Sequence, residues 1–263
     1  MLPSLFVSHG APTFPLTDAP ARTFLEGYAA RLPEQPRAIL VVSAHWEAAK
    51  PTINAPAINS TILDFHGFPA QLYSIRYPAA GSVWLADRVT ELLATDGSIV
   101  ERDAQRGLDH GAWVPLSLMF PDADIPVAQL SVETSKGAAY HYRLGQRLAP
   151  LREEGVLIIG SGSFTHDLSS FREYYHALHA TAPQWVDDFA DWMTIALEQE
   201  RVEDVLDYRE RAPFARRNHP TEEHLLPLFV AMGAANGQFP EHLHASTTHG
   251  VLRMDAFAFG ETA

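Results

Sequence analysis

The chain has 263 residues, of which 46% are hydrophobic and 19% are charged, as in an ordinary globular protein. Its formal net charge of −13 argues against nucleic acid or an anionic membrane surface as a partner. The lack of cysteine excludes disulfides, thiolate metal sites and cysteine nucleophiles. Because no apolar run approaches the length of a membrane helix and a cysteine-free chain suits the cytoplasm, we expect a cytoplasmic protein.

Strand and helix patterns alternate along the chain. The predicted strands are residues 4–7, 38–42, one edge strand within 51–62, 72–77, 125–132, 156–159 and 250–259. The predicted helices are residues 19–31 after an Asp18 cap, 81–94, 112–119, 138–148, 183–197 and 221–234 with Thr221 as cap. With no linker or repeat, this alternation predicts one α/β domain over residues 1–263. Its central sheet is expected to be largely parallel or mixed, with helices on both faces.

Three of the predicted strands lead directly into a histidine. The strand at 4–7 runs into His9, the strand at 38–42 into His45, and the strand at 156–159 into a Gly-Ser-Gly loop that ends at His166. Ligands of open α/β sheets bind outside the carboxyl ends of the strands. We therefore expect these three histidines to belong to one site.

His9, His45 and His224 are the candidate metal ligands among the 13 histidines. A buried imidazole needs partners for both ring nitrogens, and a metal ion is one such partner for His9 and His45. His224 lies in the first turn of a predicted helix and is expected to face inward. The remaining histidines fit surface or hydrogen-bonded core positions, apart from His110 and His166. Several histidines without cysteine are compatible with zinc, iron or copper.

His110 and His166 are candidates for proton transfer. His110 precedes a predicted helix, where an imidazole tends to stay neutral as a general base must; the alternative is a loop histidine bonded to Asp109. His166 follows small residues that allow a substrate to approach closely. The preceding Gly160-Ser161-Gly162-Ser163 lacks the Gly-x-Ser-x-Gly order of a nucleophile elbow, so we disfavour a serine hydrolase.

With these residues in place, the chain resembles the class III extradiol ring-cleavage dioxygenases, specifically the 4,5-DOPA dioxygenase-like subfamily. The motifs that carry the resemblance are Ser8-His9-Gly10-Ala11-Pro12, Val42-Ser43-Ala44-His45-Trp46, Asp64-Phe65-x-Gly67-Phe68-Pro69, Leu108-Asp109-His110-Gly111-x-Trp113, Pro121-Asp122-Ala123-Asp124-Ile125-Pro126, Gly160-Ser161-Gly162 and Pro220-Thr221-x-Glu223-His224-x-Leu226-Pro227-Leu228. They follow one another in the family's order and cover nearly the whole chain.

The resemblance implies an enzyme that opens the ring of a catecholic diol with O₂. It places one divalent non-haem metal on His9, His45 and His224, with His166 as acid/base or additional ligand and His110 near the substrate. Fe²⁺ is expected for turnover, and Zn²⁺ also suits an all-histidine site. The expected partners are a small aromatic diol and O₂, with the oligomeric state left open.

Four aromatic residues are candidates for the wall of a substrate pocket, or else for the core: Trp46, Phe65, Phe68 and Trp113. Two other functions stay open from the sequence. One is a non-catalytic ligand-binding member of the same fold. The other is a zinc-dependent hydrolase in which His166 or Glu223 activates metal-bound water.

Overall fold

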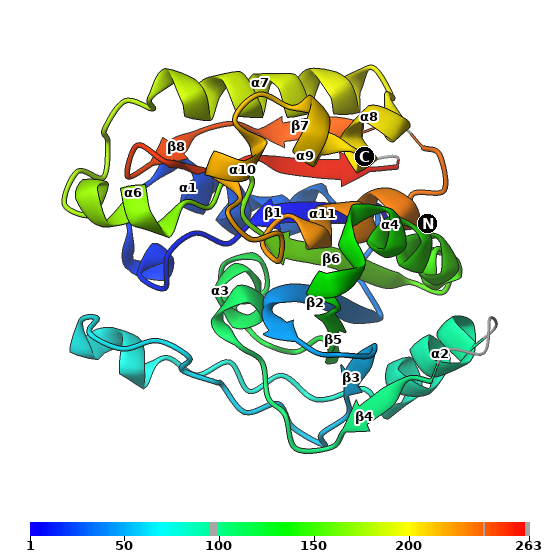
Figure 1. Cartoon of the computed structure of the whole chain (residues 1–263). Helices are drawn as coiled ribbons and strands as arrows, with labels where there is room; N and C mark the ends of the chain where they lie inside the picture. The colour runs from blue at the N-terminus through cyan, green and yellow to red at the C-terminus, as the bar shows by residue number, and fades with distance from the viewer. Residues whose placement is uncertain (95–98, 239, 261–263) are drawn as a thin grey trace.

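The apolar strands predicted near the ends and the middle of the chain form the centre of one sheet (Figure 1). The computed structural model describes residues 1–94, 99–238 and 240–260, and within them the sheet has eight strands. In spatial order these are β4 (Glu101–Asp103), β3 (Thr52–Asn54), β5 (Val127–Val132), β2 (Ala38–Glu47), β6 (Val156–Gly162), β1 (Ser4–Ser8), β10 (Ala256–Phe259) and β7 (Pro240–His244). A separate two-stranded ribbon pairs β8 (Thr247–Thr248) with β9 (Leu252–Arg253).

The four central strands, β5, β2, β6 and β1, are parallel to one another. On one side β10 is antiparallel to both β1 and β7, and on the other β3 is antiparallel to β5 and parallel to β4. The sheet is therefore mixed with a parallel centre, which confirms the predicted fold class.

Helices cover both faces of this sheet (Figure 1). The α-helices are α1 (Pro20–Tyr28), α2 (Val83–Leu93), α3 (His110–Met119), α4 (Gly137–Leu148), α5 (Pro150–Glu153), α6 (Leu168–Tyr174), α7 (Gln184–Glu198), α8 (Val202–Leu206), α9 (Tyr208–Arg211), α10 (Ala215–Asn218) and α11 (Leu226–Ala234). Short 3₁₀ helices are η1 (Phe14–Leu16), η2 (Ala29–Arg31), η3 (Ala70–Ser74) and η5 (Thr134–Lys136). In the described part of the chain, no helix is both long and apolar enough to cross a membrane.

The side chains of β2 explain why both faces are covered. Successive strand residues point to opposite faces, so an uninterrupted apolar run needs apolar partners on each side. Leu40 and Val42 pack in a core with α2, α4, α7 and α11. Ile39 and Val41 pack in a second core with α1 and α3.

The predicted strand at 72–77 is wrong. Residues 70–74 form η3, in which the Ser74 hydroxyl donates to the Gln71 carbonyl and the Tyr73 hydroxyl accepts from the Phe68 amide. Such local side-chain bonds offer the backbone an alternative to strand pairing. Strands β4 and β7 were not predicted, and the predicted strand at 250–259 is divided between β9 and β10.

Two predicted helix starts are also wrong. The helix after Asp18 begins at Pro20 with Ala19 as its N-cap, and the helix after Thr221 begins only at Leu226. The Thr221 hydroxyl donates to the Glu223 carboxylate, 3.0 Å away, instead of capping. In both helices proline occupies the first turn, where its missing N–H leaves no hydrogen bond unmade.

The carboxyl ends of the parallel strands bring the histidines to one edge of the sheet. His9 directly follows β1, and His166 lies in the loop after β6. His45 lies inside β2, which continues to Glu47 instead of ending at Val42; the pairing of β2 with β5 shifts register after Val42.

Glycines on β6 allow the segment that carries His224 to touch the sheet. A Cβ atom on Gly160 would overlap the carbonyl oxygen of Pro227, and one on Gly162 would overlap that of His224. The Ser163 amide donates to the same His224 carbonyl at 2.9 Å. His224 is therefore held against the end of β6 by its backbone.

We expect Gly160→Ala to destabilise the protein by about 1–3 kcal/mol, because the added methyl group has no space against Pro227. Gly27→Ala is the matched control, since Gly27 lies on α1 and a methyl group added there would meet no heavy atom within 4 Å. Alanine there should be neutral or stabilising by about 0.5–1 kcal/mol. Urea unfolding of both variants measures the difference, and equal stability of the two would contradict this packing argument.

Candidate metal centre

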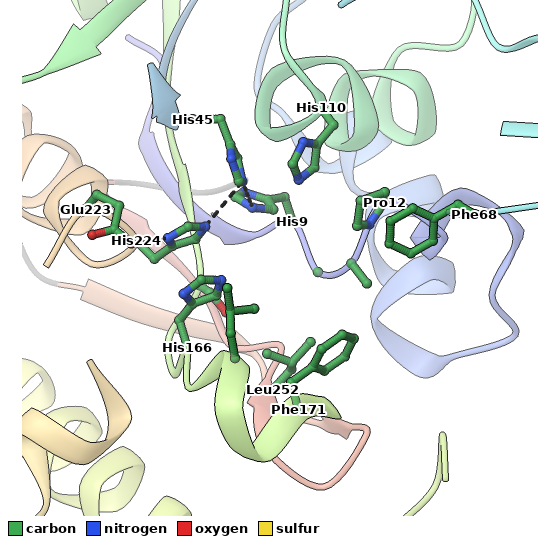
Figure 2. Close-up of a pocket in the computed structure, with 14 residues that line it drawn as sticks. His9, Pro12, His45, Phe68, His110, His166, Phe171, Glu223, His224 and Leu252 are labelled. Atoms are coloured by element: carbon green, nitrogen blue, oxygen red, sulfur yellow. Dashed lines mark hydrogen bonds and ion pairs between the residues drawn. The ribbon is translucent and has the colours of Figure 1, made fainter. Parts of the chain in front are cut away.

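The imidazoles of His9, His45 and His224 each turn one nitrogen toward a common point (Figure 2). Nε2 of His45 lies 3.0 Å from Nε2 of His9 and 3.2 Å from Nε2 of His224. All three side chains are largely shielded from solvent. Residues from the end of β1, from β2 and from the segment before α11 thus meet at one place.

The hydrogen bonds of His9 fix which of its nitrogens carries the proton. The Ser161 hydroxyl donates its only proton to the Gly111 carbonyl, so toward His9 it acts as an acceptor. Nδ1 of His9, 3.0 Å from that hydroxyl oxygen, must therefore be the protonated nitrogen. This leaves a bare lone pair on Nε2, the atom that faces the other two histidines.

A carboxylate fixes the ring of His224 in the same way. Nδ1 of His224 lies 3.0 Å from Oε1 of Glu223, and an ionised carboxylate can only accept, so Nδ1 is the donor. Nδ1 of His45 lies 3.9 Å from Oδ2 of Asp64, beyond hydrogen-bond distance, so that carboxylate acts on the His45 ring through its charge alone. Partners on the far nitrogen orient metal-binding histidines in this manner.

Burial keeps the three rings neutral. It is the largest cause that lowers the pKa of His9 and of His224 well below 6.5, and the neighbouring histidines lower both further. The pKa of His45 is likewise lowered by burial and by His110, although Asp64 opposes the shift. Three neutral lone pairs pointed at one another repel, and a cation between them removes the repulsion.

The geometry fits a bound divalent metal. Nitrogen donors at about 2.1 Å from one metal ion would lie roughly 3.0–3.4 Å apart. The separations of 3.0 and 3.2 Å fall in this range. Neutral imidazoles without thiolates suit iron and zinc alike.

His110 lies beside this group and is held by Asp64, a residue for which the sequence patterns predicted no role of its own. Oδ2 of Asp64 lies 2.9 Å from Nδ1 of His110, and Oδ1 accepts the His110 amide at 3.1 Å. The ring centres of His110 and His45 are 3.8 Å apart. Asp109, the alternative partner for His110, instead caps α3 and bonds Ser43 and Arg106.

His166 lies against His224 on the other side of the group. The two rings are stacked, with centres 3.4 Å apart and planes 10° apart. Burial, followed by His110, lowers the pKa of His166 to about 4, so the ring is neutral at pH 7. The loop of His166 is fixed by its amide, which donates to the Asn218 carbonyl at 2.9 Å.

A cavity of about 270 Å³ opens beside the histidines. Its polar side is formed by His9, His45, His110, His166, His224, Ser163 and Glu223. Its apolar side is formed by Gly10, Ala11, Pro12, Phe68, Leu168, Phe171 and Leu252. A small cavity with a few converging polar groups in an apolar wall is the usual form of a ligand site.

The four aromatic candidates take different positions. Phe68 lines the cavity, and Phe65 lies behind it, with ring centres 5.5 Å from Phe68 and 6.0 Å from His110. Trp113 is fully buried in the core of α1 and α3, where its indole N–H donates to the Ile62 carbonyl. The ring of Trp46 lies under the Arg106 guanidinium, 4.4 Å away, and does not line the cavity.

Sequence reasoning also missed the supporting residues Ser161 and His219. Ser161 stands in one of the family motifs, but nothing in the sequence shows that its hydroxyl faces His9. His219 is fully buried, and its Nε2 lies 3.0 Å from the Phe164 carbonyl in the loop that leads to His166. Asp64 opens the Asp-Phe-x-Gly motif, but the motif does not show that its carboxylate faces His110.

Comparisons with known proteins give one consistent family. Residues 3–256 match the family model described as the catalytic LigB subunit of aromatic ring-opening dioxygenase. A 4,5-DOPA dioxygenase extradiol of Beta vulgaris is 46% identical, over 98% of this chain and 97% of that protein. The 4,5-DOPA dioxygenase extradiol of Escherichia coli K12 is 39% identical, over 91% of this chain and 87% of that protein.

A solved structure shares the fold of this chain. A crystal structure of an uncharacterized protein from Escherichia coli K12 aligns with a TM-score of 0.81 and 33% identity, covering 99% of this chain and 100% of that one. The family predicted from the motifs is thereby confirmed. The chain belongs to the family of the catalytic LigB subunit of aromatic ring-opening dioxygenase, as an extradiol ring-opening enzyme.

Proposed function

We propose that this chain is a metal-dependent extradiol dioxygenase that opens the ring of a DOPA-like or otherwise substituted catechol with O₂. The observation that carries the proposal is the convergence of three Nε2 atoms beside a partly apolar cavity. Near-full-length similarity to proteins named 4,5-DOPA dioxygenase extradiol supports a catecholic substrate.

In this proposal His9, His45 and His224 hold one divalent non-haem metal per chain. We expect Fe²⁺ for turnover, while the same three imidazoles also suit Zn²⁺. When bound, the metal supplies positive charge that favours the catecholate form of the diol and a path for its electrons to O₂. Three protein ligands leave positions open for both substrates.

His110 is our candidate for the base that takes a proton from the diol. Oδ2 of Asp64 lies 2.9 Å from Nδ1 of His110, and the charge of this carboxylate favours a proton on Nδ1, which leaves on Nε2 the lone pair that can receive a proton. Both oxygens of Asp64 are engaged with His110, one with the ring and one with the amide. Asp64 is thus a positioning residue that sets the orientation and tautomer of His110.

His166 is our candidate for a second proton-transfer group, acting at the opposite side of the diol. Its low pKa keeps it neutral at pH 7, ready to accept a proton and return it. The alternative is a fourth metal ligand, since ligand atoms of His166, Glu223 and His224 lie within 4.8 Å of one another.

In this proposal three of the aromatic candidates form the wall of the substrate pocket, and the fourth, Trp46, supports the site from outside it. Phe68 contacts the substrate ring from the cavity surface, and Phe65 supports it from behind, against Trp113. Trp46 acts indirectly by holding Arg106, which donates to the His45 carbonyl at 3.3 Å. We further propose that residues 1–263 work as one catalytic domain in the cytoplasm.

Oxygen consumption after anaerobic loading with Fe²⁺ tests the function. We expect each catechol molecule to consume one O₂ and both atoms of ¹⁸O₂ to appear in the ring-opened product. The matched control is the His9→Ala variant treated identically. Catechol binding without oxygen uptake would instead support a ligand-binding protein, and ester hydrolysis by the zinc-loaded chain without O₂ would support a hydrolase.

We expect His166→Phe to keep most of the bound iron and to lose about 10²–10⁴-fold in ring-cleavage rate, as for removal of a positioned acid/base. An iron titration of the purified variant, followed by anaerobic catechol binding and O₂ addition, measures both quantities. If the variant loses its bound iron and regains activity when iron is added in excess, His166 is a metal ligand. Normal iron binding together with the parent rate of ring cleavage would show that His166 is neither a metal ligand nor the acid/base.

We expect Asp64→Asn to lower kcat at saturating iron by roughly 10–100-fold, because an amide no longer dictates the tautomer of His110. Asp122→Asn removes the same charge at an exposed position outside the lining of this cavity and serves as the control. Both variants should keep the parent Tm. Equal kcat values for the two variants would show that Asp64 does not position the base.

A further inference from the structure

We infer that His219 is a positioning residue for ring cleavage, which places the imidazole of His166 by holding the loop between β6 and α6. The inference rests on the proposed function, in which His166 transfers a proton at the bound diol. It adds to that step a residue that does not line the cavity. Its support is the set of hydrogen bonds that His219 and the adjacent Asn218 make with this loop.

The position of the His166 ring depends on the backbone that carries it. The ring is stacked on His224 (Figure 2), with ring centres 3.4 Å apart, and makes no hydrogen bond to another residue in the described part of the chain. His9 and His224 differ from it, since Ser161 and Glu223 hold their Nδ1 atoms. Stacking alone allows a ring to slide, so the loop of His166 has to be fixed in another way.

Residues 218 and 219 hold this loop at two points. Nε2 of His219 lies 3.0 Å from the Phe164 carbonyl oxygen, and because that oxygen can only accept, Nε2 carries the proton. The His166 amide donates to the Asn218 carbonyl at 2.9 Å. The two bonds lie on either side of Thr165, so together they set where the His166 backbone lies.

The other bonds of the loop leave the Phe164 carbonyl to His219. The Phe164 amide donates to the Ser8 hydroxyl at 3.1 Å, and the Ser163 hydroxyl donates to the Thr165 carbonyl at 2.7 Å. Phe164 is fully buried. Without the donor of His219, its carbonyl would lose a hydrogen bond away from water, which favours movement of the loop toward another partner.

Packing alone does not explain a histidine at position 219. The residue is fully buried, and its ring centre lies 5.5 Å from that of Phe189 and 6.3 Å from that of Tyr208. Burial lowers the pKa of His219 to about 3, so the ring is neutral, and its Nδ1 has no hydrogen-bond partner among the described residues. A phenyl ring would avoid the cost of burying that nitrogen. What the imidazole adds is the N–H for Phe164.

The test replaces His219 in two ways. Phenylalanine fills the same space without a donor, whereas the side-chain amide of glutamine supplies an N–H in place of Nε2–H. His219→Leu is the second donor-free variant if His219→Phe does not fold. The matched control is His141→Phe, since His141 is also buried, bonds the Gly137 carbonyl and the Glu133 amide, and does not line the cavity.

The first measurement needs neither iron nor substrate. Hydrogen exchange of the His166 amide is followed by NMR in the chain labelled with ¹⁵N-histidine. We expect exchange at least about 10-fold faster than in the parent for His219→Phe, because the loop opens more often. His219→Gln and His141→Phe should stay near the parent rate. Equal rates in the parent and His219→Phe would overturn the inference.

The second measurement is ring cleavage by the iron-loaded chain. We expect His219→Phe to lower kcat about 10–100-fold at unchanged iron content, as for a displaced proton-transfer group, and His219→Gln to restore most of it. In the His166→Phe background, adding His219→Phe should lower kcat by less than about 2-fold, because the ring that it positions is already gone. His141→Phe should keep the parent kcat.

The outcomes separate this inference from the proposed function. The parent kcat in His219→Phe, or losses that multiply in the double variant, would show that His219 does not act through His166. Loss of iron in proportion to kcat would show a disturbed metal centre instead, and would also overturn the inference. If the parent chain itself consumes no oxygen with a catechol, it is the proposed function that fails, and the inference fails with it.

Discussion

Three neutral imidazoles with their lone pairs directed at one point are the arrangement on which the rest of the site depends. Ser161 and Glu223 keep the proton on the far nitrogens of His9 and His224, and burial keeps the rings uncharged. Such a cluster is electrostatically incomplete without a cation. The surrounding fold can hold it because each ring is anchored through its own second nitrogen or through its backbone.

The parallel centre of the sheet explains how distant residues reach this point. Parallel strands end at the same edge, so β1 and β2 deliver His9 and His45 side by side. His224 arrives from a helix start instead, and it fits because Gly162 leaves room for its carbonyl beside β6. The cavity then lies between polar histidines and the apolar residues of α6 and β9. The metal ligands and the substrate cavity thus lie together at the carboxyl ends of the parallel strands.

The sequence predicts the central strands, both helical layers and the histidines at the strand ends, because apolar runs and their periodicity report burial directly. It does not predict η3 or the late start of α11, where local side-chain bonds and Pro227 decide the backbone. Asp64 and Ser161 were missed for a related reason. Each is a polar residue whose partner lies at least 46 positions away in the chain, so no local pattern reveals the contact.

X-ray absorption at the iron edge of the Fe²⁺-loaded chain tests the central claim most directly. The arrangement of His9, His45 and His224 predicts three imidazole nitrogens at about 2.1 Å from the metal. Replacing any one of the three by alanine should remove one imidazole from the spectrum or the metal from the protein. A parent spectrum dominated by carboxylate oxygens, or one unchanged in all three alanine variants, would contradict the account.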